Sequence, residues 1–262
     1  MAPPPPLETI LIERLSTGTV LLSYNTPKRS NAFTPQQYDD LREGLVWARE
    51  EAEVRVVVVT GRGRHYCADR AMGGPSDTIE AEVRAGAALS AVLMPFPKVL
   101  IAAVHGASIG WGCTQLSNFD LVYAHQDAFF QTPFMQLGLV PEGGSSYMFP
   151  RVMGRVQANR LLLAGERMSA QQAYLSGLIT EVVEADSPDA FLAKAVEKAK
   201  IIGGYSAEAL LMAKKLIMDA TDDFKARKAA GERERRDILI RFSRDETKAS
   251  LAAAGNKSKA KM

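Results

Sequence analysis

One carboxylate, Glu142, stands between a proline and two glycines within residues 138–146. Pro141 fixes its own φ, and glycines adopt backbone conformations that other residues resist, so the segment predicts a tight turn. Ser145 and Ser146 are suited to hydrogen-bond free backbone groups at a helix start, which would place Glu142 near the positive end of a helix dipole. The stretch alone allows two interpretations: a solvated acid in a turn, or an acid/base group.

Metal chemistry is not expected from the remaining reactive side chains. His65, His105 and His125 show neither an H-x-x-x-H spacing nor a Cys/His pattern. Cys67 and Cys113 are the two cysteines, which indicates no disulfide framework and fits a reducing compartment.

Composition excludes several other classes of protein. Of the 262 residues, 47% are hydrophobic and 24% are charged, which is typical of a globular chain with a substantial core. A formal charge of +2 argues against nucleic acid as the main partner. No apolar run reaches membrane-spanning length, and residues 1–6, Met-Ala-Pro-Pro-Pro-Pro, do not form a secretory signal.

The last three residues suggest a targeting signal, which we call the address. Residues 256–262 are basic and end in the small, basic, apolar order Ala260-Lys261-Met262. This order matches the Ser-Lys-Leu pattern that a peroxisomal import receptor recognises. The alternative is a solvated, frayed terminus.

The first half of the chain predicts strands alternating with helices. Residues 8–15 and 19–24 indicate a β-hairpin, and Thr34 followed by Pro35 starts a helix to about residue 51. Apolar runs predict further strands over 54–60, 99–104 and 121–124, with an Ala-rich helix before Pro95. The alternation predicts βαβ units and a largely parallel, helix-covered sheet, hence an α/β fold.

The second half is predicted to be mainly helical. The expected helices span 159–164, 169–176, 189–201 and 207–220, with a brief strand at 179–183. Residues 224–245 alternate charge with few apolar residues, which favours a solvated helix face. We divide the chain into a core over 1–200, a helical region of the same domain over 201–250, and a flexible basic tail over 251–262.

Four motifs in order resemble the crotonase (enoyl-CoA hydratase/isomerase) superfamily, and within it the peroxisomal Δ3,Δ2-enoyl-CoA isomerases. They are His-Tyr-Cys-Ala at 65–68, the strand and Gly-rich bend at 98–113, Phe-Asp-Leu-Val-Tyr-Ala at 119–124, and Gly-Leu-Val-Pro-Glu-Gly-Gly-Ser-Ser at 138–146. The resemblance implies a ββα spiral core, with C-terminal helices that assemble the chain into trimers or hexamers. It also implies acyl-CoA substrates, in which coenzyme A is part of the substrate and no separate cofactor is needed.

The resemblance also assigns site residues. The backbone N–H groups of Ala68 and Trp111 take the positions that bind the thioester oxygen and stabilise the enolate. The two glutamates that hydratases use correspond to Thr114 and Phe134, neither of which is a carboxylate, so hydration is disfavoured. Glu142 takes the position of the isomerase base.

A 1,3-proton shift needs one group that removes a proton from C2 and returns it to C4. A single glutamate whose pKa is raised by an apolar pocket suits this task. Trp111, Phe134 and Leu137 are the expected walls of the acyl pocket. For Trp111, the alternative is a purely structural core aromatic.

Binding of the CoA moiety is expected at two places. Lys28 and Arg29 precede a loop that lies near the nucleotide in the family, although ordinary exposed cations are the alternative. The second place is the segment Ala68, Asp69, Arg70, Ala71 and Met72. Asp69 stands where the family has glycine; alternatively, the loop is one or two residues shorter and Asp69 takes the place of the family's later aspartate. Either way, the direction of the Ala68 amide is decisive.

The sequence therefore predicts a peroxisomal enzyme that shifts a 3-enoyl-CoA double bond to the 2-trans position in fatty acid β-oxidation. Two alternatives remain open. One is another crotonase-type acyl-CoA enzyme of secondary metabolism, and the other is a catalytically silent acyl-CoA-binding protein, which the departure at Asp69 favours.

Overall fold

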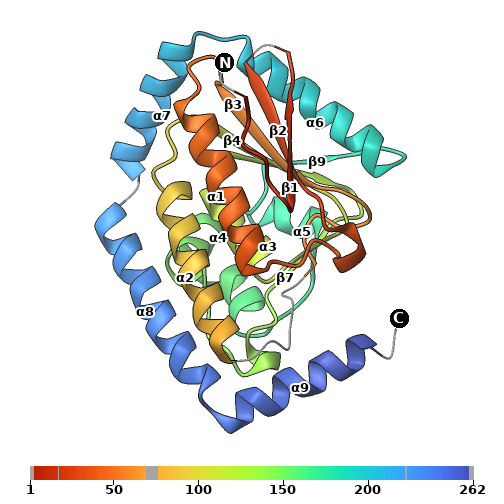
Figure 1. The fold of residues 1–262 in the computed structure, drawn as a ribbon, viewed down its shortest axis with the longest axis vertical. Helices are drawn as coiled ribbons and strands as arrows, with labels where there is room; N and C mark the ends of the chain where they lie inside the picture. The colour runs from red at the N-terminus through yellow and green to blue at the C-terminus, as the bar shows by residue number, and fades with distance from the viewer. Residues whose placement is uncertain (1–2, 17, 69–75, 222, 260–262) are drawn as a thin grey trace.

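A six-stranded sheet forms the centre of the molecule in a computed structural model that describes residues 3–16, 18–68, 76–221 and 223–259 (Figure 1). Its strands are β1 (Ile10–Arg14), β2 (Thr19–Tyr24), β3 (Val56–Gly61), β4 (Val99–Val104), β6 (Leu121–His125) and β9 (Glu181–Val183). Their order is β1-β2-β3-β4-β6-β9, with β1 antiparallel to β2 and every other neighbouring pair parallel. The predicted hairpin and parallel sheet are confirmed.

The sheet is buried on both faces, as the continuous apolar runs predict. On β3, Val57 and Val59 belong to one hydrophobic cluster, whereas Val56 and Val58 belong to a second cluster with Phe191. Helices α1 (Pro35–Glu50) and α2 (Ser76–Leu93) contribute to the first cluster, and α6 (Pro188–Gly203) contributes to the second. The Thr34 side chain accepts a hydrogen bond from Gln37 N, so the predicted cap of α1 is confirmed.

A second sheet was not predicted. It has three short strands, β5 (Ala107–Ile109), β7 (Phe129–Gln131) and β8 (Met168–Ser169), in the order β5-β7-β8. Phe130 and Met168 are fully buried in the larger hydrophobic cluster. Runs of two or three residues carry too little periodicity to be recognised in a sequence. The α/β class is confirmed, with two sheets rather than one.

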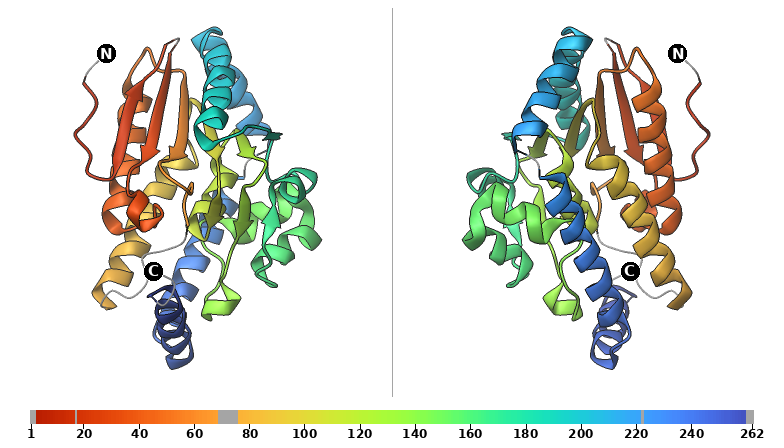
Figure 2. Two further views of the ribbon diagram at one scale, coloured as in Figure 1. Left: turned by 90° about the vertical axis from the view of Figure 1, so that its right-hand side faces the viewer. Right: turned by 90° about the vertical axis from the view of Figure 1, so that its left-hand side faces the viewer.

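The remaining helices follow the second sheet or connect its strands. They are α3 (Trp111–Thr114), α4 (Ser145–Leu162), α5 (Ala170–Leu175), α7 (Ala207–Thr221), α8 (Phe224–Phe242) and α9 (Asp245–Lys259), with 3-10 turns η1 (Pro27–Arg29), η2 (Gln115–Asn118) and η3 (Met135–Leu137). Helix α4 is longer than the sequence predicts, because it includes Pro150 and continues across a kink at Gly154. Figures 1 and 2 show α9 at the end of the molecule farthest from α6 and α7.

One prediction about the C-terminal part is wrong, and another stays a prediction. Helix α8 is not a solvated face, because Ala230, Glu234, Ile238 and Phe242 are among its buried residues. Residues 251–259 form the last part of α9, and the flexibility of the tail over 251–262 stays a prediction. The targeting signal at 260–262 lies outside the described residues. Within the described part of the chain, no helix has the length and apolar character that crossing a bilayer requires.

Candidate active site

Glu142 lies in a turn immediately before α4, as predicted. Gly143 and Gly144 have φ values of 69° and 79°, in the left-handed region that glycine tolerates. The Ser145 N–H and Oγ–H both donate to the carbonyl oxygen of Glu142, at 3.1 and 2.7 Å. Ser145 therefore fixes the backbone of the glutamate itself.

Close packing joins this turn to α3. A Cβ on Gly143 would lie 2.7 Å from Thr114 Oγ1 and 3.2 Å from Trp111 Cζ3. Only a residue without a side chain allows the two segments to approach so closely. The contact brings Glu142 and Trp111, which are 31 positions apart in the sequence, to one site.

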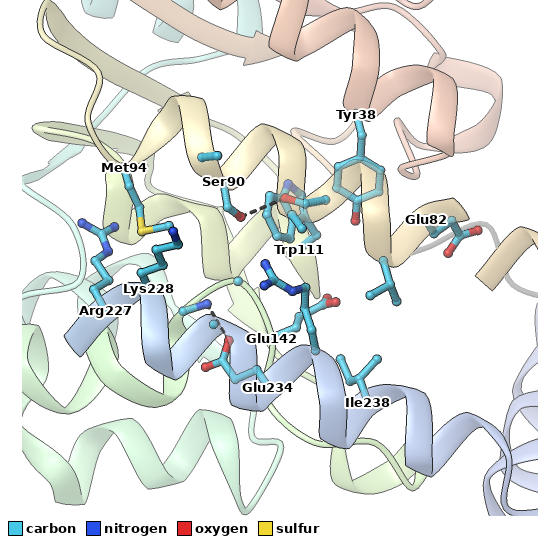
Figure 3. Close-up of a pocket in the computed structure, with 18 of the residues that line it drawn as sticks. Tyr38, Glu82, Ser90, Met94, Trp111, Glu142, Arg227, Lys228, Glu234 and Ile238 are labelled. Atoms are coloured by element: carbon cyan, nitrogen blue, oxygen red, sulfur yellow. Dashed lines mark hydrogen bonds between the residues drawn. The ribbon is translucent and has the colours of Figure 1, made fainter. Parts of the chain in front are cut away.

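Both residues line a cavity of about 330 Å³, within the usual size range of small-molecule sites (Figure 3). Its walls come from α1, α2, α3, the turn before α4, and α8. The lining residues are Tyr38, Glu82, Val83, Gly86, Ala87, Ser90, Ala91, Met94, Pro95, Trp111, Glu142, Gly143, Gly144, Phe224, Arg227, Lys228, Gly231, Glu234, Arg235 and Ile238. A mostly apolar wall with a few charged groups suits an acyl chain with a polar reacting centre.

Trp111 serves both the core and the cavity wall. Its side chain is 7% exposed, and its ring packs edge-on against Tyr38 with the centroids 5.1 Å apart. Trp111 is also the first residue of α3, so its backbone N–H has no acceptor within that helix. Gly110, with φ 58°, turns the chain into this position.

The assignment of Ala68 as an oxyanion donor is not supported. The Ala68 N–H donates to the carbonyl oxygen of Ser30 at 2.9 Å, and Ala68 does not line the cavity. The preceding residue, Cys67, forms an isolated parallel β-bridge with Ser108. This backbone pairing orients the Ala68 amide toward the turn that ends at Ser30. The other predicted contacts of this segment, Asp69, Arg70, Ala71 and Met72, lie outside the described residues.

Two of the three predicted acyl-pocket residues are placed elsewhere. Phe134 and Leu137 are buried in the larger hydrophobic cluster and do not line the cavity. The turn η3 draws them inward, because Leu139 N–H donates to Phe134 O at 2.7 Å and Gly138 reverses the chain with φ 67°. Of the three, only Trp111 is a wall of the cavity.

Lys28 and Arg29 are exposed on η1 and do not line the cavity. They lie beside the loop that leaves β3, because Ser30 O accepts the Ala68 N–H and Pro27 packs against Gly63. Lys28 and Arg29 therefore lie near Ala68, the described residue of the second predicted place, and nucleotide binding at either place stays a prediction.

Several lining residues were missed in the sequence, above all Glu82 and Glu234, which are 6% and 7% exposed. Burial raises the pKa of Glu234, while hydrogen bonds from Ser146 and Gly144 oppose the shift. Ala230, Ile238 and Phe242 are spaced by eight and four residues, the signal of a buried helix stripe. The many charged residues of the same helix made this stripe hard to recognise in the sequence.

The histidines are structural in the described part of the chain. His65 Nδ1 accepts the Ala107 N–H at 3.1 Å, and His105 Nε2 lies 2.9 Å from Gly63 O. Burial lowers the pKa of both imidazoles. Among the described residues, no group of three or more His, Cys, Asp or Glu side chains is arranged to hold a metal ion.

Comparison with known proteins gives a consistent result. A family model described as enoyl-CoA hydratase/isomerase matches residues 15–261. Human enoyl-CoA delta isomerase 2 is 33% identical over 219 residues, which are 80% of this chain and 54% of the relative. Mouse peroxisomal enoyl-CoA delta isomerase 3 is 34% identical over 172 residues, 63% of this chain and 54% of the relative. The chain thus spans about half the length of these relatives.

The solved structures agree with the family match. A crystal structure of an enoyl-CoA hydratase/isomerase from Pseudoalteromonas atlantica superposes with a TM-score of 0.82 at 27% identity, covering 95% of this chain and 98% of that one. Residues 15–261, which the family model matches, include every strand from β2 onward and the C-terminal helices up to Lys259. The chain has the crotonase fold and belongs to the enoyl-CoA hydratase/isomerase family.

Proposed function

We propose that this protein is a Δ3,Δ2-enoyl-CoA isomerase. The observation that carries the proposal is the position of Glu142, which faces a mostly apolar cavity beside the first backbone N–H of α3. The relatives named enoyl-CoA delta isomerase support the same activity, although this chain spans only about half their length.

In the proposed reaction, Glu142 removes a proton from C2 of a 3-enoyl-CoA. The electrons move toward the thioester oxygen, where the Trp111 N–H stabilises the developing negative charge. The protonated Glu142 then delivers the proton to C4, the double bond moves to C2, and the carboxylate is regenerated. The step is a proton transfer with no net oxidation, so we propose that it needs no cofactor besides the CoA carried by the substrate.

Hydration is disfavoured by the residues at the two positions where hydratases carry glutamates. Thr114 is fully buried against Gly143, and Phe134 lies in the core. Glu82 is an additional carboxylate on the cavity wall, but it stands at neither of these two positions. We therefore expect the wild-type protein to form no 3-hydroxyacyl-CoA. We also expect the Glu82→Gln variant to keep the isomerase product.

The assay follows the conjugated product by absorbance for the wild-type protein and for the Glu142→Gln variant. General acid/base groups contribute about 10²–10⁴-fold to rates, so we expect kcat of Glu142→Gln to fall by at least about 100-fold. Glu184→Gln, at an exposed acid outside the cavity, is the matched control. Equal rates for the wild-type protein and Glu142→Gln would rule out this role for Glu142.

A second candidate is a silent acyl-CoA-binding protein, which the hydrogen bond from Ala68 N–H to Ser30 O favours. That bond removes one predicted donor for the enolate oxygen. Isothermal titration with an acyl-CoA, together with the isomerase assay, separates the candidates. Tight binding without turnover of any 3-enoyl-CoA would establish the silent role.

Substrate binding, location and assembly complete the proposal. We propose that Lys28 and Arg29, with the segment 68–72, bind the phosphates of CoA, and that the protein acts in peroxisomal β-oxidation. A fluorescent fusion that loses Ala260–Met262 is expected to become cytosolic, whereas unchanged punctate fluorescence would refute the address. We also propose a homotrimer, or a hexamer of two trimers, as the working form.

A further inference from the structure

Glu234 of α8 is bound to the turn that carries Glu142. Its Oε2 accepts the Gly144 N–H at 2.7 Å (Figure 3). Its Oε1 accepts the Ser146 N–H at 2.9 Å. The Ser146 hydroxyl donates to the same Oε1. All three of these hydrogen bonds are donated to the carboxyl group, which is the environment of an ionised carboxylate.

These hydrogen bonds replace a missing helix cap. Gly144 is the N-cap residue of α4 and has no side chain to bond the first free N–H groups of the 18-residue helix. Glu234 supplies the acceptors from a helix some 90 residues later, and its negative charge lies at the positive end of the α4 dipole. We call these hydrogen bonds from Gly144 and Ser146 to Glu234 the clamp. The clamp joins α8, one wall of the cavity, to the turn at Glu142–Ser145.

We propose that Glu234 is a positioning residue for the acid/base group, which rests on the proposed function of Glu142. It holds the backbone two residues after Glu142 and thereby fixes where that carboxylate points. Because Glu234 accepts three hydrogen bonds from Gly144 and Ser146, we assign its action to the turn that carries Glu142.

The charge of Glu234 has a second consequence for Glu142. A free α4 N-terminus would stabilise the ionised form of Glu142 and lower its pKa, whereas the Glu234 carboxylate offsets that effect. The other charged groups on the cavity walls are Glu82 from α2 and Arg227, Lys228 and Arg235 from α8, with Arg233 adjacent in the sequence. Replacing Glu234 by glutamine leaves these groups in place and removes one negative charge.

The test compares Glu234→Gln with Glu232→Gln, which makes the same chemical change at an exposed position of the same helix. We expect Glu234→Gln to lower kcat by about 10-fold or more, with a smaller change in KM, because a misplaced acid/base group loses transition-state stabilisation. In a plot of kcat/KM against pH, the acidic limb of Glu234→Gln should move to lower pH, because one negative charge near Glu142 is removed. Glu232→Gln should match the wild-type protein.

Hydrogen exchange gives a readout that does not depend on activity. The amides of residues 143–148 should exchange faster in Glu234→Gln than in the wild-type protein and in Glu232→Gln. Ser146→Ala, which removes one of the three donors, should give a smaller effect in the same direction.

The outcomes separate this proposal from the proposed function. Wild-type kcat, pH profile and exchange in Glu234→Gln would overturn the positioning role. A lower melting temperature with an unchanged kcat and pH profile would also overturn it, because the residue would then be only structural. Full activity in Glu142→Gln would instead overturn the proposed function, while the exchange data would still decide whether the clamp orders the turn.

Discussion

At the scale of single residues, the site depends on two adjacent glycines that differ in the space available for a side chain. Gly143 and Gly144 both have positive φ, but a Cβ on Gly143 would lie 2.7 Å from Thr114 Oγ1, whereas a Cβ on Gly144 meets nothing within 4 Å. Gly144→Ala therefore adds only backbone strain, about 1–2 kcal/mol for an L-residue in this region. Gly143→Ala adds the same strain and a collision.

We expect Gly143→Ala to reduce kcat by about 10–100-fold, because the collision moves the turn that carries Glu142. Gly144→Ala should lose mainly unfolding free energy, measured by urea denaturation. The double variant Gly143→Ala with Thr114→Ala removes the Oγ1 contact and should recover part of the lost kcat. Equal kcat values for the two single alanine variants would contradict the role of the contact with Thr114.

A second prediction at this scale concerns His65 and acid stability. Burial and the positive charges of Arg64, His105 and Arg167 lower the pKa of His65, and its Nδ1 must stay unprotonated to accept the Ala107 N–H. Because the folded-state pKa is below that of the unfolded chain, the unfolded state binds more protons in this range. The stabilisation is present above the unfolded-state pKa, near 6.5, and is lost as the pH falls toward the lower folded-state value.

Asparagine offers an acceptor at the same place and does not titrate. Between pH 7.5 and pH 5.5, the melting temperature of the His65→Asn variant should therefore fall less than that of the wild-type protein. Part of the loss should remain, since burial also lowers the pKa of His105. Identical pH dependence in the two proteins would show that His65 does not couple protonation to folding.

At the scale of elements, α8 provides an open position in the cavity wall. Gly231 lines the cavity, and a Cβ built there meets no atom within 4 Å. Gly231→Ala should raise the unfolding free energy by up to about 1 kcal/mol, because glycine is a poor helix former. Gly231→Leu should fold equally well but fill part of the cavity.

We expect Gly231→Leu to raise KM for long-chain 3-enoyl-CoA substrates far more than for short-chain ones, relative to Gly231→Ala. The measurement is a series of KM values against acyl chain length for both variants. A uniform change across the series would mean that the acyl chain does not occupy the space next to α8.

The elements that sequence analysis predicted correctly are those with long, regular patterns. The runs at β3 and β4 were recognised because uninterrupted apolar residues are typical of strands buried on both faces. Helix α8 was misjudged because its charges outnumber its buried apolar residues, and the clamp from Glu234 to Gly144 joins segments 90 residues apart. No local pattern reports such a contact.

The same limit applies to the site. Glu142 and Trp111 were found because the family resemblance assigns those positions, and the structure brings them to one cavity. The direction of the Ala68 amide could not be predicted, because it depends on a partner, Ser30, that only the folded chain supplies. Phe134 and Leu137 were misplaced because a 3-10 turn, and not their hydrophobicity, decides which way they face.

At the scale of the whole molecule, α7 presents an apolar surface. Leu211, Met212, Leu216 and Ile217 are exposed on this helix, and Leu216 and Ile217 are 68% and 63% exposed. Met212 and Leu216 are four positions apart and are therefore neighbours on the helix surface. Contiguous exposed apolar residues of this kind mark interaction surfaces in soluble proteins. This surface supports the proposed self-association through the helical region.

We expect light scattering after gel filtration to give the mass of three or six chains for the wild-type protein. A variant with Leu216→Glu and Ile217→Glu should shift toward the mass of one chain while keeping its circular dichroism spectrum, because burying two carboxylates in an apolar contact costs several kcal/mol. Lys215→Gln, on the same helix and 73% exposed, should assemble as the wild-type protein does. A single-chain mass for the wild-type protein would refute the oligomer, and an unchanged mass for the double variant would place the contact away from α7.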